Sequence, residues 1–207
     1  MLNKIFNPDN AFFRVMGVLV DVFAFSLMWL VCAATVVGLG PGTAALYDAM
    51  ARCMSRGNTG GYLRFWSSLK ANFKVGCLAG LLVVAAGYGL SKLNAVLYAQ
   101  ALGGGAMIVA FLFFRLLLVV LCGMAAWIFP VLSRFTFGVG GLLAASAKLA
   151  LAHPLATAAL GVLTGACIWV SYVYWLPALV LPYLWARAAE PLLERVFKPF
   201  MEAQGEA

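Results

Sequence analysis

The fold class follows from one stretch of the chain, Met107-Ile-Val-Ala-Phe-Leu-Phe-Phe-Arg115-Leu-Leu-Leu-Val-Val-Leu-Cys-Gly-Met-Ala-Ala-Trp-Ile-Phe129. Its only charged residue is Arg115, and it is longer than the roughly 20 apolar residues with which an α-helix crosses the hydrocarbon core of a bilayer. The stretch therefore predicts a transmembrane helix. An arginine near the middle of such a helix is costly in lipid and requires a partner or a polar cavity.

The composition agrees with an integral membrane protein. Of 207 residues, 65% are hydrophobic and 10% are charged, and the mean hydropathy is +0.99. A soluble domain of this length needs more polar surface. The net charge of +7 is divided among short loops and forms no continuous basic face, so we expect no nucleic acid partner. We attribute this charge to membrane orientation and to contact with anionic lipid.

The apolar stretches predict an all-α fold, a polytopic transmembrane helical bundle that forms a single domain over residues 1–207. We expect about five spans. Their approximate positions are 13–37, 75–96, 106–132, 155–172 and 175–189. The last span is interrupted by Pro177 and Pro182, and it continues into an amphipathic C-terminal segment.

Three segments between the spans are predicted to be short amphipathic helices. Their approximate positions are 43–54, 61–74 and 139–152. In the second, aromatic residues such as Phe65 recur at helical spacing opposite Arg64 and Lys70. Two placements are open for such helices, at the membrane surface or packed against the transmembrane helices.

Two spans contain pairs of glycines four residues apart. Gly76 and Gly80 lie in the second span, and Gly161 and Gly165 lie at a similar place in the fourth. Small residues at this spacing let helices approach closely. Because the first two spans and the next two share a layout, a degenerate internal repeat is one interpretation.

Basic residues are distributed unequally between the two sides of a five-span arrangement. One side holds ten of them and the other holds three, so the positive-inside rule places the N-terminus outside and the C-terminus in the cytoplasm. The larger group consists of Arg52, Arg56, Arg64, Lys70, Lys74, Arg134, Lys148, Arg187, Arg195 and Lys198, and the smaller group consists of Lys4, Arg14 and Lys92.

The candidate intramembrane site is formed by Asp21 and Arg115. Asp21 lies eight residues after Phe13, and Arg115 lies nine residues after Ala106, so both lie roughly 12 to 14 Å from the same membrane face. Opposite charges at equal depth predict an ion pair. Two roles are open for this pair, a structural contact in the bundle or the lining of a solute path or partner contact.

The sequence contains no pattern typical of an active site. It has no G-x-S-x-G, H-E-x-x-H or P-loop motif, and its five cysteines include no C-x-x-C pair. We therefore expect no catalytic residue, no metal site, no cofactor and no enzyme activity. Glu190 and Glu194 lie four residues apart, with Arg187 and Lys198 at compatible spacings, and this pattern predicts surface ion pairs.

The N-terminal third resembles the YesL-like family of small bacterial membrane proteins, a domain of unknown function. The resembling residues are Asn7-Pro8-Asp9-Asn10, Phe12-Phe13-Arg14, Trp29-Leu30-Val31-Cys32, Val36-Val37, Gly40, Thr43, Ala45-Leu46-Tyr47, Phe65 and Leu69-Lys70-x-Asn72-Phe73-Lys74. Thr35 and Gly38 stand where the family pattern has proline and threonine. The resemblance covers mainly residues 7–74, and it implies no catalytic residues.

Members of the YesL-like family commonly accompany carbohydrate ABC importers and glycan-degrading enzymes, which implies a role in sugar uptake. We therefore expect an accessory protein that contacts permease or ATPase subunits through the segment 43–74. The expected docking residues are Asp48, Arg52, Arg64, Trp66, Lys70 and Lys74. Two alternatives are a small solute transporter or channel, alone or as a homo-oligomer, with a polar path at Asp21 and Arg115, and a membrane scaffold or sensor for a signalling partner.

Overall fold

The computed structural model describes residues 11–56 and 58–203, so the first part of the YesL-like motif, Asn7 to Asn10, lies outside the described residues. No strand occurs in these two ranges, and the predicted all-α fold is confirmed. The helices in chain order are α2 (Ala11–Ala34), α3 (Leu39–Arg52), η1 (Met54–Arg56), α4 (Gly61–Ala71), α5 (Phe73–Ala101), α6 (Ala106–Arg134), α7 (Val139–Ala152), α8 (Pro154–Val173), η2 (Leu176–Leu179) and α9 (Leu181–Ala203).

Among the described residues, four helices are long and apolar enough to cross a membrane, and α7 is a shorter apolar helix. The four are α2 from Val15 onward, α5, α6 and α8. The fifth predicted span, 175–189, is divided in the structure between η2 and the start of α9. Because proline lacks a backbone N–H and suits the first turn of a helix, Pro182 begins a new helix there. α9 carries charges along its length and does not qualify as an apolar span.

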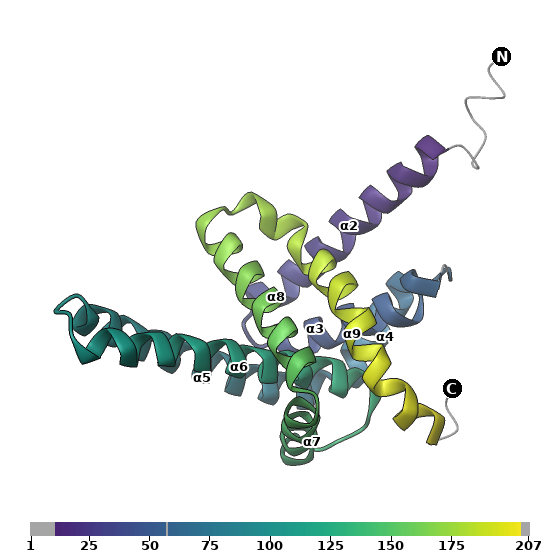
Figure 1. Ribbon diagram of the computed structural model, residues 1–207. Coiled ribbons are helices and arrows are strands. Elements are labelled where there is room, and N and C mark those ends of the chain that lie inside the picture. Colours follow the sequence, from purple (N-terminus) through teal and green to yellow (C-terminus); the bar gives the residue numbers. More distant parts are fainter. Residues whose placement is uncertain (1–10, 57, 204–207) are drawn as a thin grey trace.

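α3 lies at the centre of the molecule, and α2, α4, α5, α6 and α9 surround it (Figure 1). Every residue from Gly40 to Ala51 is buried. The helix is rich in glycine and alanine, so its neighbours can approach it closely on all sides. A Cβ atom at Gly40 would collide with the carbonyl oxygen of Gly76 in α5. The segment predicted at 43–54 is therefore packed inside the molecule and does not lie on a surface.

α4 covers α3 with one face and leaves the other face open. Phe65, Ser68 and Leu69 are buried against the core, whereas Leu63 and Trp66 are exposed. The predicted amphipathic pattern of this segment is confirmed for Phe65 and Leu69, whereas Trp66 of the predicted apolar face is exposed and Ser68 of the predicted polar face is buried.

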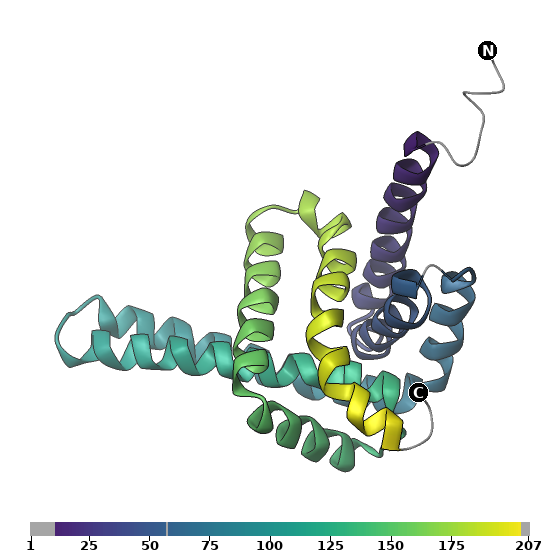
Figure 2. The same ribbon diagram turned by 45° about the vertical axis from the view of Figure 1, so that its right-hand side comes forward.

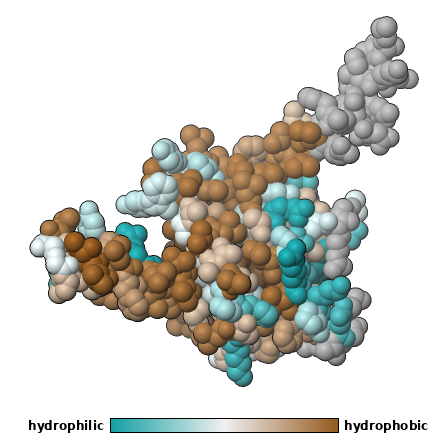
Figure 3. Space-filling view, viewed as in Figure 1, coloured by the Kyte–Doolittle hydropathy of each residue, from teal (hydrophilic) through white to brown (hydrophobic). Residues whose placement is uncertain are grey.

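α5 and α6 form a long antiparallel hairpin that extends away from the body (Figures 1 and 2). Gly104 and Gly105 form its turn with φ angles of 82° and 70°, a left-handed conformation that favours glycine. The space-filling view shows a mainly hydrophobic surface over this hairpin (Figure 3). The N-terminal half of α2 also leaves the body, in a different direction, and its residues from Val15 to Val20 are exposed.

The two glycine pairs pack differently. Gly76 and Gly80 both contact the Gly40–Pro41 segment of α3, whereas in α8 only Gly161 makes a close contact, with Val119 and Gly123 of α6. Gly165 has no heavy atom within 4 Å of the position of an added Cβ. The internal repeat stays a prediction.

A pair of similar tryptophan contacts occurs in the two halves of the chain. Trp29 donates a hydrogen bond from Nε1 to Oγ1 of Thr43 at 2.9 Å, and Trp127 donates to Thr157 at 3.1 Å. The hydroxyl of Thr43 in turn donates to the backbone carbonyl of Leu39, and that of Thr157 lies 2.7 Å from the carbonyl oxygen of Ala150 and 3.0 Å from that of His153. Both contacts therefore fix the end of one helix against the first turn of a later helix.

α9 runs antiparallel to α8 and returns to the body (Figure 2). Its buried face, which includes Ala186, Ala189, Leu193 and Phe197, packs on the core. Phe197 contacts Trp127 of α6 edge to face, with ring centroids 5.9 Å apart. This contact fixes the C-terminal part of α9 against the C-terminal half of α6.

Candidate functional site

Asp48, the one carboxylate of α3, is buried, with 1% of its side chain exposed. Arg64 of α4 donates from Nε to Oδ2 at 2.6 Å and from Nη2 to Oδ1 at 3.3 Å. Arg52 places its Nε 2.9 Å from the same Oδ1. A buried carboxylate without such partners would strongly destabilise the fold. The two arginines therefore compensate Asp48 and fix α4 to α3.

The Asp48 cluster extends from the core to the surface. The side chains of Arg52 and Arg64 are 37% and 38% exposed. With one negative and two positive groups, the cluster has a net charge of +1. Asp48 itself is too deeply buried to contact a partner protein. It was expected as a docking residue, but its role is to position the two arginines whose side chains reach the surface.

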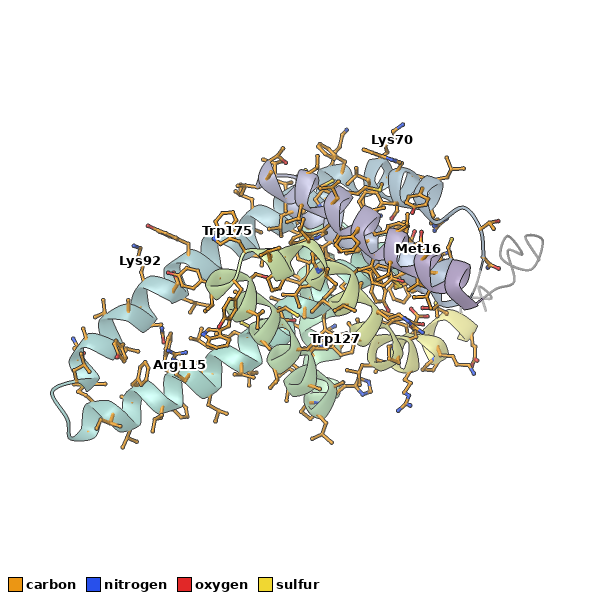
Figure 4. The ribbon with its side chains drawn as sticks, turned by 90° about the horizontal axis from the view of Figure 1, so that it is seen from above. Met16, Lys70, Lys92, Arg115, Trp127 and Trp175 are labelled. Carbon is orange, nitrogen blue, oxygen red and sulfur yellow. The ribbon has the colours of Figure 1, made fainter. Side chains whose placement is uncertain are left out.

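The exposed face of α4 combines apolar and basic side chains. Leu63 is 78% exposed and Trp66 is 50% exposed, and Lys70 follows at helical spacing. Lys74, in the first turn of α5, is exposed as well. Figure 4 shows Lys70 pointing away from the body. We refer to Leu63, Arg64, Trp66, Lys70 and Lys74 as the α4 face.

A second polar cluster joins three helices around Glu194. Arg134 of α6 donates to Oε1 of Glu194 from Nε at 3.1 Å and from Nη2 at 2.5 Å, and the hydroxyl of Tyr47 donates to the same oxygen at 2.9 Å. Burial, together with the nearby negative charge of Glu194, raises the pKa of Tyr47 well above its ordinary value. This cluster fixes α9 to both α3 and α6.

The Glu194 cluster was not predicted from the sequence. Surface ion pairs were expected for both glutamates of α9, and this is confirmed only for Glu190, whose Oε2 lies 2.7 Å from Nη1 of Arg187. Glu194 was assigned wrongly, because it borders the buried stripe of α9 and faces Arg134. A signal was present in the sequence, since Glu194 directly follows Leu193 and precedes Phe197 by three residues.

The structure does not bring Asp21 and Arg115 together within the chain. Oδ1 of Asp21 accepts a hydrogen bond of 2.7 Å from the hydroxyl of Tyr62, and the guanidinium of Arg115 lies 5.0 Å from the centroid of the Phe111 ring. The residues described include no ion pair between the two. The reason is geometric: α2 and the α5–α6 hairpin leave the body in different directions, with Arg115 and Met16 of α2 far apart in Figure 4.

Tyr62 connects the N-terminal end of α4 to α2. Its ring stacks on Phe25, with the centroids 4.7 Å apart and the planes at 4°. Burial and the hydrogen bond to Asp21 raise the pKa of Tyr62 to about 12. Asp21 therefore has a hydrogen-bond partner within its own chain, Tyr62, that was not predicted from the sequence.

Over the described residues, no group of three or more His, Cys, Asp or Glu side chains is placed to hold a metal ion. The five cysteines are free thiols at five separate places.

The segment from Val22 to Ser91 contains α3, α4, the Asp48 cluster and Trp66 and Lys70 of the α4 face. It matches the family described as a protein of unknown function, DUF624. The match covers residues 22–91, about a third of the chain. Because the YesL family is DUF624, the predicted resemblance is confirmed. No curated protein and no solved structure matches the chain.

The DUF624 segment does not include every polar contact of the core. It holds Asp48 with both of its arginines, together with Tyr47, whereas Arg134 and Glu194 lie beyond its end. The α4 face and the residues that position it are therefore the candidate site for a function shared within DUF624.

Proposed function

We propose that this protein is a non-catalytic accessory protein of the bacterial cytoplasmic membrane that assists or regulates carbohydrate uptake by an ABC importer. The match of residues 22–91 to DUF624 supports the proposal, since the gene setting of the YesL-like family implies sugar uptake. The four apolar helices support a place in the membrane.

The observation that carries the proposal is the α4 face. Tryptophan and arginine are enriched among the residues that dominate binding energy at protein interfaces. Trp66 lies beside Lys70, and Arg64 is held in place by Asp48. Such a surface complements a partner with an apolar pocket bordered by carboxylates. A permease or ATPase subunit of an importer is the partner that we propose.

The proposed orientation makes this surface accessible to cytoplasmic subunits. We place the N-terminus outside and the loops that carry α4 and α7 in the cytoplasm, following the positive-inside rule. Lys70, Lys74 and Lys148 then lie on the cytoplasmic side. An ATPase subunit, or the cytoplasmic loops of a permease, would reach the α4 face directly.

The test is purification of a tagged copy from native membranes in mild detergent, followed by mass spectrometry. We expect importer subunits in near-stoichiometric amount, and at least a tenfold loss of them in the Trp66→Ala, Lys70→Glu double variant. The matched control is Arg195→Glu, a charge reversal at an exposed position of α9, which should retain them. If the double variant and the control retain equal amounts, the α4 face is not the docking surface.

The same experiment separates the alternatives. Purified protein that moves solute into sealed vesicles without other subunits would replace the accessory function with that of a small transporter. Near-stoichiometric recovery of a signalling protein in place of importer subunits would favour a membrane scaffold or sensor.

A further inference from the structure

The α5–α6 hairpin carries an unpaired cation within an apolar span. Arg115 lies nine residues after Ala106, about 14 Å from the start of α6, and its side chain is exposed. In the part of the chain that the structure describes, it forms no ion pair, and its guanidinium lies over the face of Phe111. Charged side chains in hydrocarbon pair with opposite charges or face water. Arg115 therefore requires a counter-charge or water from outside its own hairpin.

Of the five acidic residues that the structure describes, four are committed to contacts with basic side chains. Within the described residues, Asp48, Glu190, Glu194 and Glu202 each pair with a basic side chain. Asp21 differs, because its carboxylate accepts one hydrogen bond, from Tyr62. A carboxylate has about four acceptor positions, so Asp21 can accept an arginine as well.

Asp21 and Arg115 occupy equivalent positions along their helices. Asp21 lies ten residues after Ala11, about 15 Å from the start of α2, which is close to the 14 Å of Arg115 along α6. Both helices begin at an outer end and run inward to the body (Figures 1 and 2). Half of a hydrocarbon core measures roughly 15 Å. At these positions the side chains of Asp21 and Arg115 are therefore too far from the outer ends of their helices to contact a lipid headgroup directly.

We infer that Arg115 of one copy pairs with Asp21 of a second copy in a two-fold symmetric dimer. In such a dimer the same contact occurs twice, so both charges of each copy are compensated. The surfaces beside the two residues are free and apolar: Val18 and Phe23 are exposed on α2, and Leu112 and Leu116 are exposed on α6. Asp21 and Arg115 have opposite charges, equivalent positions along their helices and exposed apolar neighbours. These features favour a second copy of this chain as the partner. This inference does not depend on the proposed function.

The test uses charge reversal in two differently tagged full-length chains, co-expressed and purified in mild detergent. Asp21→Arg alone and Arg115→Asp alone should each reduce self-association at least tenfold, because each variant places like charges at both contacts. A mixture of the two single variants should associate at nearly the wild-type level. In the mixed dimer the introduced arginine faces the introduced aspartate at one contact, and native Asp21 faces native Arg115 at the other. Only contacts between copies predict this rescue.

The inference is overturned if the mixture associates no better than either variant alone, or if either variant alone associates like the wild type. Lys92→Asp is the matched control, because Lys92 lies on α5 nine residues before its end and is also exposed. This control should associate normally. If Lys92→Asp instead reduced association and Asp21→Arg restored it, Lys92 and not Arg115 would be the partner of Asp21.

Two further experiments separate the contact between copies from contacts within one chain. Tyr62→Phe removes the local bond to Asp21 and should leave the dimer intact. In a background in which the five native cysteines are replaced, chains with Asp21→Cys and chains with Arg115→Cys should form an interchain disulfide when mixed and none when alone. Absence of this disulfide from folded, mixed chains also overturns the inference.

Discussion

Arg134 at the end of α6 donates two hydrogen bonds to Glu194 of α9, although the two residues are 60 positions apart in the sequence. Tyr47 of the central helix donates to the same carboxylate oxygen. One carboxylate thus joins three helices, and α9 cannot leave the body without removing the shared acceptor of Arg134 and Tyr47. The DUF624 segment, which contains Tyr47, is thereby connected to the C-terminal third of the chain.

Replacing Glu194 with glutamine should destabilise the protein by about 3 kcal/mol, because Arg134 is only 3% exposed and would keep an uncompensated buried charge. Thermal unfolding in detergent, followed by tryptophan fluorescence, measures the change. The control is Arg187→Gln, which breaks the exposed pair with Glu190 and should cost about 0 to 1 kcal/mol. Equal effects of the two variants would mean that the Glu194 cluster does not stabilise the fold.

Asp48→Asn should have a larger effect than the loss of either of its arginines. The asparagine leaves Arg52 and Arg64 close together without their shared counter-charge, and we expect a loss of about 3 kcal/mol. Arg52→Gln or Arg64→Gln leaves one arginine on the carboxylate, and each should cost about 1 kcal/mol. Thermal unfolding of the three variants gives the order. An Asp48→Asn variant as stable as the wild type would contradict the assigned role of Asp48.

Gly40→Ala and Gly76→Ala should each destabilise the protein by about 1 to 3 kcal/mol, because an added methyl group collides with the facing backbone of α5 or α3. The matched control is Gly87→Ala, also in α5, where no atom lies within 4 Å of the added carbon. Alanine is the better helix former by about 1 kcal/mol, so this control should be neutral or stabilising. The comparison fails if Gly76→Ala and Gly87→Ala unfold at the same temperature.

Local patterns were sufficient to predict the helices, but not the place of α3. The apolar runs predicted five spans, four of which are long apolar helices in the structure, and the helical spacing around Phe65 predicted the burial of Phe65 and Leu69 in α4. The segment 43–54 has a similar amphipathic pattern, with Asp48 and Arg52 on one side, which led to two open placements. Periodicity reports which side of a helix is polar, and it cannot show that another helix compensates the charge. Arg64 of α4 does so here, and Asp48 is buried as a result.

The site residues depended on contacts between distant segments. Asp21 and Arg115 have matching positions along their helices, and a sequence yields such positions from residue counts alone. It does not yield the directions in which α2 and α6 leave the body, and these separate the two residues within one chain. The Arg134–Glu194 pair was missed for the same reason, since an i, i+4 pattern offered Glu194 a local partner.

Tyr62 provides a test of the contact between α4 and α2 at high pH. Its pKa in the folded protein is raised to about 12 from an ordinary value of 10.0, so folding favours the protonated phenol. The stabilisation is therefore fully present below pH 10 and is lost as the pH rises from about 10 to about 12. Ultraviolet absorbance of tyrosinate in wild-type protein minus that of Tyr62→Phe should show one group titrating near pH 12. In Asp21→Asn, which removes the negative charge, the same group should titrate closer to pH 10. A wild-type difference curve centred at pH 10 would show that Tyr62 is free of Asp21.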